Sequence, residues 1–116
     1  DPPVVSATPV GAMGRRLGVG ESLVIRAIET SLEWRIRFIA LEVRVSNFAA
    51  QALYEKYGFK KMGVRKRYYR DNNEDALIMT TDPIETEQYQ REFQRLKAIH
   101  AEKLAHHLVL DIPVTF

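Results

Sequence analysis

The stretch Leu41–Phe59 constrains the fold more than any other part of the chain. It overlaps a run, Ile36–Val43, that is almost continuously apolar or β-branched, which is typical of a buried strand with both faces covered. One carboxylate, Glu42, interrupts this run, and a short helical pattern over about Asn47–Tyr57 follows closely. A carboxylate inside a buried strand must be paired with a cation or open onto a cleft. The stretch therefore predicts a central strand with a potential site beside it.

The rest of the chain predicts further elements on both sides of this stretch. Apolar side chains recur at the helical period over Gly18–Glu33 and from Glu85 to about Leu110, so each range predicts an amphipathic helix. Phe59–Tyr69 and Asp75–Thr81 predict two strands joined by a D-N-N-E turn. Asp1–Gly14 has apolar residues that could form a strand, but its three prolines each remove a backbone donor.

These elements predict an α/β fold with a mixed sheet. Their order is strand, helix, strand, helix, strand and strand, followed by a C-terminal helix. The first strand, the first helix and the second strand would form one right-handed crossover unit with parallel strands.

Composition limits the class of protein. A length of 116 residues with 46% hydrophobic residues suits one globular domain. The absence of cysteine excludes disulfides and thiolate metal ligands, and suits a cytoplasmic protein. No apolar run approaches the roughly 18 residues that a membrane-spanning helix needs. The net charge of +2 is too small to indicate a nucleic-acid-binding protein by itself. Because the chain starts at Asp1 rather than Met, we expect a processed or truncated product.

A glycine-containing loop, Arg15–Gly20, stands directly at the start of the first predicted helix and reads R-R-L-G-V-G. Glycines let the backbone come close to a pyrophosphate, and the free amides at a helix N-terminus face an anion. Arg15 and Arg16 add positive charge. Taken alone, the motif favours an ordinary strand-to-helix turn, because glycine-rich turns before helices are common. Pyrophosphate binding is the alternative interpretation.

Glu42 is the first candidate functional residue. Side chains alternate along a strand, so Glu42 shares a face with Ala40 and Arg44. One interpretation is a structural ion pair between Glu42 and Arg44. The other is a carboxylate that opens onto a cleft and acts on a ligand.

Asn47 and Tyr54 are the next candidates. They lie seven residues apart, which is two helical turns, so they point the same way. Tyr54 is either a core aromatic or a site residue, and Asn47 is either a turn or cap residue or a ligand contact. Ser46 is the predicted N-cap of this helix, and Gly58 suits the left-handed position that closes it. Periodicity alone rejects none of these interpretations.

Cations crowd the first strand of the predicted hairpin and its turn, interleaved with Tyr68 and Tyr69. Cations mixed with aromatic rings can bind single-stranded nucleic acid. We favour a solvated face on which arginines stack on rings. The cations are Lys60, Lys61, Arg65, Lys66, Arg67 and Arg70.

The three histidines, His100, His106 and His107, fall on the last predicted helix. The adjacent pair cannot chelate a metal from one face, and no carboxylate completes a familiar pattern. We therefore expect solvent-facing histidines rather than a metal site. We expect the apolar face of this helix to pack on the domain. Covering a bare sheet surface and binding a second copy of the chain are the alternatives.

From Arg15 to about Thr81 the chain resembles the GCN5-related N-acetyltransferase (GNAT) family. Within this family it is similar to the enzymes that acetylate the N-terminal alanine of a ribosomal protein. The loop fits the family pattern of Arg or Gln, two residues, Gly, one residue, and Gly or Ala. Similar enzymes carry L-E-V-R-x-S-N followed by A-L-Y-E, and later an R-x-Y-Y motif with E-D-A. The matching segments here are Arg15–Gly20, Leu41–Asn47, Ala52–Glu55, Arg67–Tyr69 and Glu74–Ala76.

The resemblance implies an N-acetyltransferase that moves the acetyl group of acetyl-CoA directly to a protein N-terminal α-amine, without a covalent enzyme intermediate. Glu42 would be the general base, and Tyr54 would protonate the departing CoA thiolate. Tyr68 and Tyr69, with Glu42, would contact the acceptor. Asn47 would hold the pantetheine arm. The residues implied for acetyl-CoA are Val10, Arg15, Arg16, Leu17, Gly18, Val19, Gly20, Asn47 and Tyr54.

The resemblance covers only the later half of such an enzyme. We expect an acetyl-CoA-binding core over residues 1–82 and a C-terminal helical extension over residues 83–116. A sheet without its neighbouring strands exposes unpaired backbone groups, so we expect self-association, most simply as a homodimer. One alternative is a non-catalytic CoA-binding fragment or assembly module. Another is a small RNA-associated protein that uses the basic hairpin.

Overall fold

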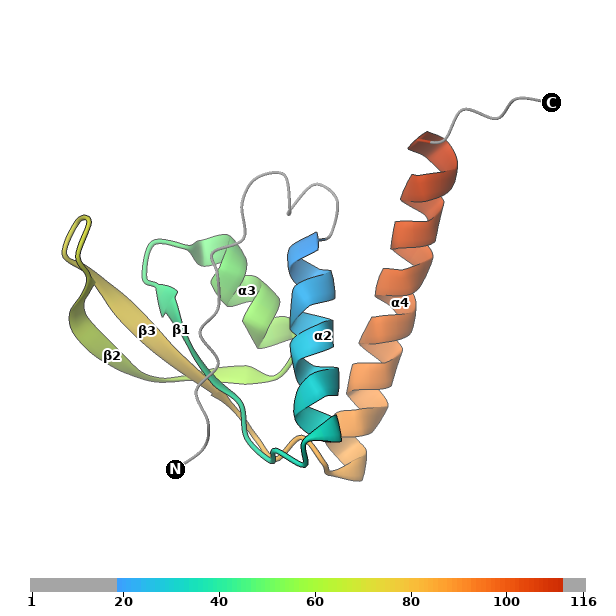
Figure 1. Cartoon of the computed structure of the whole chain (residues 1–116), viewed down its shortest axis with the longest axis horizontal. Coiled ribbons are helices and arrows are strands. Elements are labelled where there is room, and N and C mark those ends of the chain that lie inside the picture. The colour runs from blue at the N-terminus through green and yellow to red at the C-terminus, as the bar shows by residue number, and fades with distance from the viewer. Residues whose placement is uncertain (1–18, 112–116) are drawn as a thin grey trace.

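The structure, a computed structural model, describes residues 19–111 (Figure 1). The predicted strand within Asp1–Gly14, loop residues 15–18 and the tail over 112–116 lie outside the described residues. From the first predicted helix onward, the α/β class and the order of elements are confirmed. The elements are α2 (Val19–Glu33), β1 (Ala40–Arg44), α3 (Phe48–Lys56), β2 (Phe59–Tyr69), β3 (Glu74–Thr81) and α4 (Glu87–Asp111).

The three described strands form one antiparallel sheet in the order β1-β3-β2. Glu42 of β1 lies opposite Ile78 of β3, and Ile78 lies opposite Gly63 of β2. The register shifts twice along β2, the second time between Arg65 and Tyr69. Such shifts mark β-bulges, which bend a strand and re-aim its side chains. The parallel pair of the predicted crossover would need a strand that precedes the described residues.

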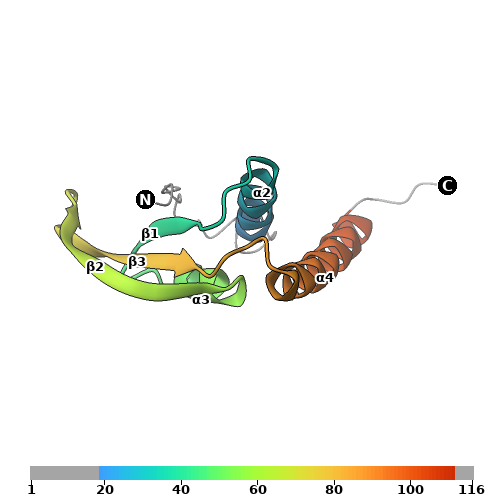
Figure 2. The ribbon, with the colours of Figure 1, turned by 90° about the horizontal axis from the view of Figure 1, so that it is seen from below.

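One hydrophobic core joins the sheet to all three described helices. α4 lies beside α2 (Figures 1 and 2), and the Lys97 ammonium on α4 donates to the Glu29 carboxylate on α2. The expected packing of the last helix on the domain is confirmed, because Phe93 and Leu96 belong to the core cluster. No helix among the described residues is long and apolar enough to span a membrane. The largest fully buried side chains are Phe93, Ile28, Ile39, Met79 and Ile84.

β1 begins later than the apolar run predicts. Arg35 has a left-handed φ of 57°, and the Ile36 amide donates to the Ser31 carbonyl at 2.8 Å. This turn closes α2 and uses the first residues of the run. The Ile39 amide then donates to the Thr81 hydroxyl at 3.0 Å, and the Ile39 carbonyl accepts from the Thr81 amide at 3.0 Å. The regular ladder starts one residue further on.

Asn47, rather than Ser46, is the N-cap of α3. The Asn47 side-chain oxygen accepts a hydrogen bond from the Ala50 amide at 3.1 Å. The Ser46 amide instead donates to the Glu74 carboxylate at 2.8 Å. The prediction of Ser46 was wrong because serine and asparagine are both good caps, and a contact with the distant hairpin decided between them. Gly58 closes α3 with a φ of 89°, as predicted.

Candidate active site

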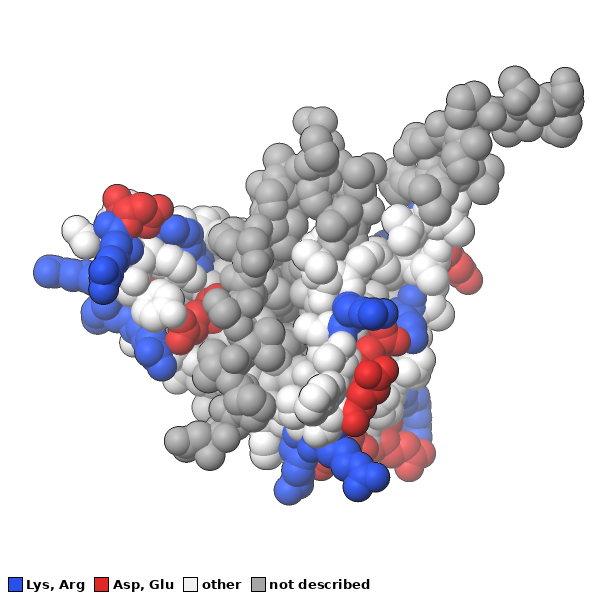
Figure 3. All heavy atoms as spheres, in the orientation of Figure 1, with Lys and Arg blue, Asp and Glu red and all other residues white. Residues whose placement is uncertain are grey.

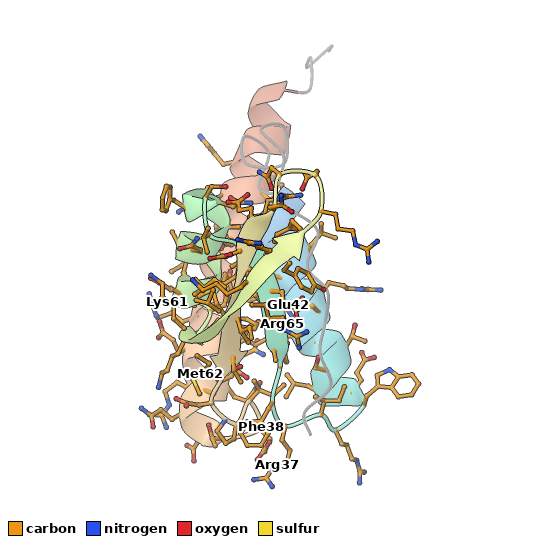
Figure 4. All side chains as sticks on the ribbon, turned by 90° about the vertical axis from the view of Figure 1, so that its left-hand side faces the viewer. Arg37, Phe38, Glu42, Lys61, Met62 and Arg65 are labelled. Carbon is orange, nitrogen blue, oxygen red and sulfur yellow. The ribbon has the colours of Figure 1, made fainter. Side chains whose placement is uncertain are left out.

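Glu42 lies in the middle of β1, beside Arg65 (Figure 4). The Glu42 side chain is only 11% exposed, and Arg65 Nε lies 3.1 Å from its Oε1. Tyr68 also interacts with this carboxylate, and the interaction raises the pKa of the Tyr68 phenol. Both partners come from β2, although Glu42 is on β1 and β3 lies between the two strands. The carboxylate of the apolar run is therefore paired, as burial requires.

Arg44 is not the partner of Glu42, so the interpretation of Glu42 as an ion-pair partner of Arg44 was wrong. The Arg44 guanidinium binds Asp71 at 3.0 Å and Glu74 at 3.4 Å, and it lies 4.0 Å from the centroid of the Tyr69 ring. The reason is that the β2–β3 turn brings two carboxylates to the end of β1, where Arg44 is located. Glu42 lies further inside the sheet and meets the side chain of Arg65 instead.

Tyr68 and Tyr69, the predicted acceptor contacts, lie beside Glu42. Their rings meet edge to face, with centroids 5.1 Å apart. Burial of Tyr69 is the main cause that raises its pKa, and the negative charge of Glu42 adds to the shift. Tyr68 is 44% exposed. The structure thus brings together one carboxylate and two phenols on the same part of the sheet, with one of the phenols open to solvent.

Tyr54 lies on the buried side of α3 and is 3% exposed. The centroid of its ring is 5.8 Å from that of Phe59. Burial, with a smaller contribution from Tyr69, raises the pKa of Tyr54. A raised pKa keeps the hydroxyl protonated at neutral pH, as a proton donor requires, but also makes the hydroxyl a weaker acid. The structure shows Tyr54 as a core aromatic.

Most of the basic hairpin is neutralised within the chain. Figure 3 shows acidic and basic atoms mixed over this end of the molecule. Arg65 Cζ also lies 5.8 Å from the centroid of the Tyr68 ring, so the predicted solvated face with a ring-stacked arginine is confirmed. Nucleic acid binding needs cations that are free to neutralise phosphates, and this arrangement does not favour it. The ion pairs are Lys60 with Asp82, Lys61 with Glu55, Arg65 with Glu42 and Lys66 with Asp75.

The first turn of α2 fits an anion site. Val19 and Gly20 begin the helix, whereas Val10 and residues 15–18 of the predicted acetyl-CoA set lie outside the described residues. A carboxylate at this turn, Glu21, would repel an anion, but it accepts hydrogen bonds from the Tyr57 hydroxyl at 2.5 Å and the Lys56 ammonium at 2.9 Å. Burial by itself would raise the pKa of Glu21. The two hydrogen bonds outweigh burial, so the pKa is lowered. Its charge is thus compensated, and the positive end of the helix dipole still favours an anion.

His100 is buried, so the expectation of solvent-facing histidines was wrong for this residue. Its Nε2 lies 2.8 Å from Ser22 Oγ, and its Nδ1 lies 3.6 Å from Glu21 Oε1. The reason is that α4 packs along α2 and encloses this side chain, while His106 is exposed. The side chain of His107 is not among those that the structure describes. Among the described residues, no cluster of histidines and carboxylates could hold a metal ion.

Arg65 was not predicted as the partner of Glu42, only as one of the cations of the hairpin. The pairing depends on the register of β1 and β2 against β3, in which Glu42 and Gly63 both lie opposite Ile78. The D-N-N-E turn could have fixed the register of the hairpin. Nothing in the sequence fixed how β1 pairs with β3.

Comparison with known proteins supports the resemblance. Residues 10–59 match the family model of the acetyltransferase (GNAT) family. A Bacillus subtilis protein provisionally assigned as a ribosomal protein bS18-alanine N-acetyltransferase is 52% identical over 65 residues, or 56% of this chain and 43% of that protein. The Escherichia coli ribosomal protein bS18-alanine N-acetyltransferase is 42% identical over 67 residues, or 56% of this chain and 45% of that protein. The chain therefore spans less than half the length of these curated relatives.

Solved structures share the fold over a similar part. The crystal structure of the ribosomal-protein-S18-alanine N-acetyltransferase from Escherichia coli aligns with a TM-score of 0.54 and 38% identity, covering 62% of this chain and 48% of that one. A chain of the NatC complex bound to Gag peptide and CoA aligns with a TM-score of 0.60 and 33% identity, covering 68% of this chain and 49% of that one. The described residues therefore have a partial GNAT fold.

Proposed function

We propose that this chain, whose residues 10–59 match the model of the GNAT acetyltransferase family, is the later half of an enzyme that acetylates a protein N-terminal α-amine. The observation that carries the proposal is the nearly buried Glu42 carboxylate beside Tyr68 and Tyr69 on one part of the sheet. The relatives named as bS18-alanine N-acetyltransferases support a ribosomal-protein alanine as the acceptor. A cytoplasmic location would suit such an acceptor.

On the acceptor side, Glu42 is the proposed general base. An α-ammonium has a pKa near 8, so a modest base is enough to produce the neutral amine at neutral pH. The nitrogen then attacks the thioester carbonyl, the new C–N bond forms and the C–S bond breaks. Before this attack, the first ammonium proton goes to the Glu42 carboxylate directly or through a water. The second proton, which the nitrogen loses after the attack, replaces the proton that Tyr54 gives to the departing thiolate. Tyr68 and Tyr69 contact the acceptor next to this carboxylate.

On the donor side, acetyl-CoA supplies the acetyl group as a thioester, which makes the acyl carbon electrophilic. The amides of residues 15–20 and the charges of Arg15 and Arg16 would hold its pyrophosphate, with Val10, Leu17, Gly18 and Val19 as further contacts. Asn47 would hold the pantetheine arm in addition to capping α3. Tyr54 would donate a proton to the departing thiolate. Because its raised pKa makes Tyr54 a weaker acid, this proton transfer depends most on the position of the hydroxyl and on the electrostatic field of the site.

The C-terminal residues 83–116 are proposed as an extension of the core over residues 1–82, because Ile84 and Phe93 are members of its hydrophobic cluster. We also propose that the chain associates with a second copy, since β1 has a described strand on only one side. β2 is the less suitable edge for such pairing, because charged side chains and bulges disfavour the addition of another strand.

The test of the proposed function is Glu42→Gln, which removes basicity and preserves shape. We expect turnover on an Ala-starting peptide to fall by roughly 10²–10⁴-fold, the usual contribution of a general base. Affinity for acetyl-CoA should stay unchanged in calorimetric titration. Glu55→Gln is the matched control, because it removes an exposed carboxylate that is also paired with a cation, Lys61.

Two results would count against the proposal. A loss of thermal stability that matches the loss of activity would make Glu42 a structural ion-pair residue. Acetyl-CoA binding without transfer by the parent chain would instead support the alternative, a non-catalytic CoA-binding module.

A further inference from the structure

The ion pair between Arg65 and Glu42 is asymmetric. The Glu42 side chain is 11% exposed, whereas the Arg65 side chain is 55% exposed. Arg65 Nε lies 3.1 Å from Glu42 Oε1. Exposure of the arginine weakens such an ion pair, because water competes for the guanidinium. The carboxylate needs a cation, but Arg65 is not firmly held as that cation.

Arg65 also contacts a second group, the ring of Tyr68. Its guanidinium carbon lies 5.8 Å from the centroid of the Tyr68 ring, within the range of a cation–π contact. Tyr68 is itself 44% exposed, so an arginine that moves off Glu42 can stay over the ring and reach water. Tyr68 also interacts with Glu42 itself. Release of Arg65 would therefore leave the carboxylate beside Tyr68 and without a cation.

We propose that Arg65 is an exchangeable counter-ion of Glu42, which occupies the carboxylate in the free protein and yields it to the α-ammonium group of the acceptor. The inference rests on the proposed function, because it names the chemical form in which the acceptor reaches the base. Acceptor binding replaces one cation with another, so Glu42 is never left buried and unpaired. An acceptor without a positive charge cannot make this exchange.

The exchange predicts that the site selects the charged form of an amine. A peptide with a free α-amine displaces Arg65, and the same peptide with an acetylated N-terminus does not. This also favours release of the product, because the acetylated amine is neutral and Arg65 returns to Glu42. Arg65 therefore acts as a positioning residue that sets acceptor affinity, and it has no part in bond formation.

The first test follows the Arg65 Nε–H resonance by NMR in the ¹⁵N-labelled chain, assigned by its loss in Arg65→Lys. We expect an Ala-starting peptide with a free N-terminus to shift this resonance towards the position of solvent-exposed arginines. The N-acetylated peptide at the same concentration should leave it in place. If the free peptide binds without moving the resonance, or if neither peptide moves it, the exchange does not occur.

The second test measures peptide affinity by calorimetry in Arg65→Met, which keeps an apolar stem and removes the competing charge. We expect the free peptide to bind about two- to fivefold more tightly, the range that weak exposed ion pairs can account for. Lys60→Met is the matched control on the same strand, because Lys60 pairs with Asp82 rather than with Glu42. The affinity of this variant for the free peptide should equal that of the parent. Arg65→Lys keeps the charge and should bind like the parent.

An unchanged or weaker affinity in Arg65→Met, with Arg65→Lys folded and normal, would make Arg65 a fixed structural partner and overturn the inference. Acetyl transfer measured on the same samples separates this from the proposed function. Transfer without displacement of Arg65 overturns only the exchange. Displacement without transfer supports the exchange and counts against the enzymatic function.

Discussion

Arg67 has a left-handed backbone conformation, with a φ of 52°. It lies within the second register shift of β2, and its amide donates to the Asp75 carboxylate at 2.8 Å. Its side chain is exposed. The fold therefore uses the backbone of this residue at a bulge beside Glu42 and Tyr68, and the conformation is one that only glycine adopts without cost.

We expect Arg67→Gly to stabilise the protein. A left-handed conformation costs an L-residue about 1–2 kcal/mol, and the greater freedom of glycine in the unfolded chain offsets part of this gain. The free energy of unfolding should rise by about 0.5–1 kcal/mol in urea denaturation. The control, Arg70→Gly, removes a nearby exposed arginine without relieving a left-handed φ and should not stabilise. A loss of stability in Arg67→Gly would mean that the arginine side chain makes a contact of its own.

At the scale of elements, the connection from α3 to β2 depends on Gly58. Its φ is 89°, and its amide donates to the Glu55 carbonyl at 3.0 Å. An added Cβ would lie 2.9 Å from Cε2 of Tyr89, whose hydroxyl donates to the Tyr57 carbonyl at 2.7 Å. The same position therefore ends a helix, starts a strand and receives the first turns of α4.

We expect Gly58→Ala to destabilise the protein by about 2 kcal/mol, because the left-handed conformation is costly for alanine and the Tyr89 ring must move. Gly63→Ala is the control, since its Cβ would meet nothing closer than Ile78 Cδ1 at 4.0 Å. Thermal unfolding followed by circular dichroism checks both. Equal melting temperatures for the two variants would show that the turn tolerates a side chain.

Arg44 links three elements in one network. It joins the end of β1 to Asp71 and Glu74 at the β2–β3 hairpin. The Glu74 carboxylate in turn accepts a hydrogen bond from the Ser46 amide, just before α3. Its guanidinium also lies over Tyr69. The residue that the sequence proposed as a partner for Glu42 instead fixes the position of one of the two tyrosines beside Glu42.

At the scale of the whole molecule, α4 shares the hydrophobic core of the sheet. Phe93 is 2% exposed, its ring stacks on Tyr89 with centroids 6.3 Å apart, and it meets the edge of Tyr57 at the same distance. Polar contacts between Lys97 and Glu29 and between His100 and Ser22 hold α4 along α2. The C-terminal helix is thus joined to the start of the helix that follows the proposed pyrophosphate loop.

We expect Phe93→Ala to lower the free energy of unfolding by about 3–5 kcal/mol, because it leaves a cavity where α4 meets Tyr57, just after α3. Hydrogen exchange should show α4 and the sheet losing protection together, as one cooperative unit. Glu92→Ala, the exposed neighbour, should change stability by less than about 0.5 kcal/mol. Loss of protection confined to α4 would instead show that this helix unfolds independently of the sheet.

The sequence by itself determined the elements and the chemistry they carry. Helical and strand periods, the turn residues and Gly58 placed α2, α3, β2, β3 and α4 to within a few residues, because these signals are local. A carboxylate in an apolar run marked Glu42 as a residue that needs a partner. The motifs around it indicated the GNAT family, since they keep their spacing along the chain.

The tertiary structure alone decided which residues meet. Arg65 rather than Arg44 pairs with Glu42, Asn47 rather than Ser46 caps α3, and His100 is buried against α2. Each outcome depends on strand register or on packing between segments far apart in the chain. Such contacts are chosen by the free energy of the whole core, so the pattern around any one residue does not contain them.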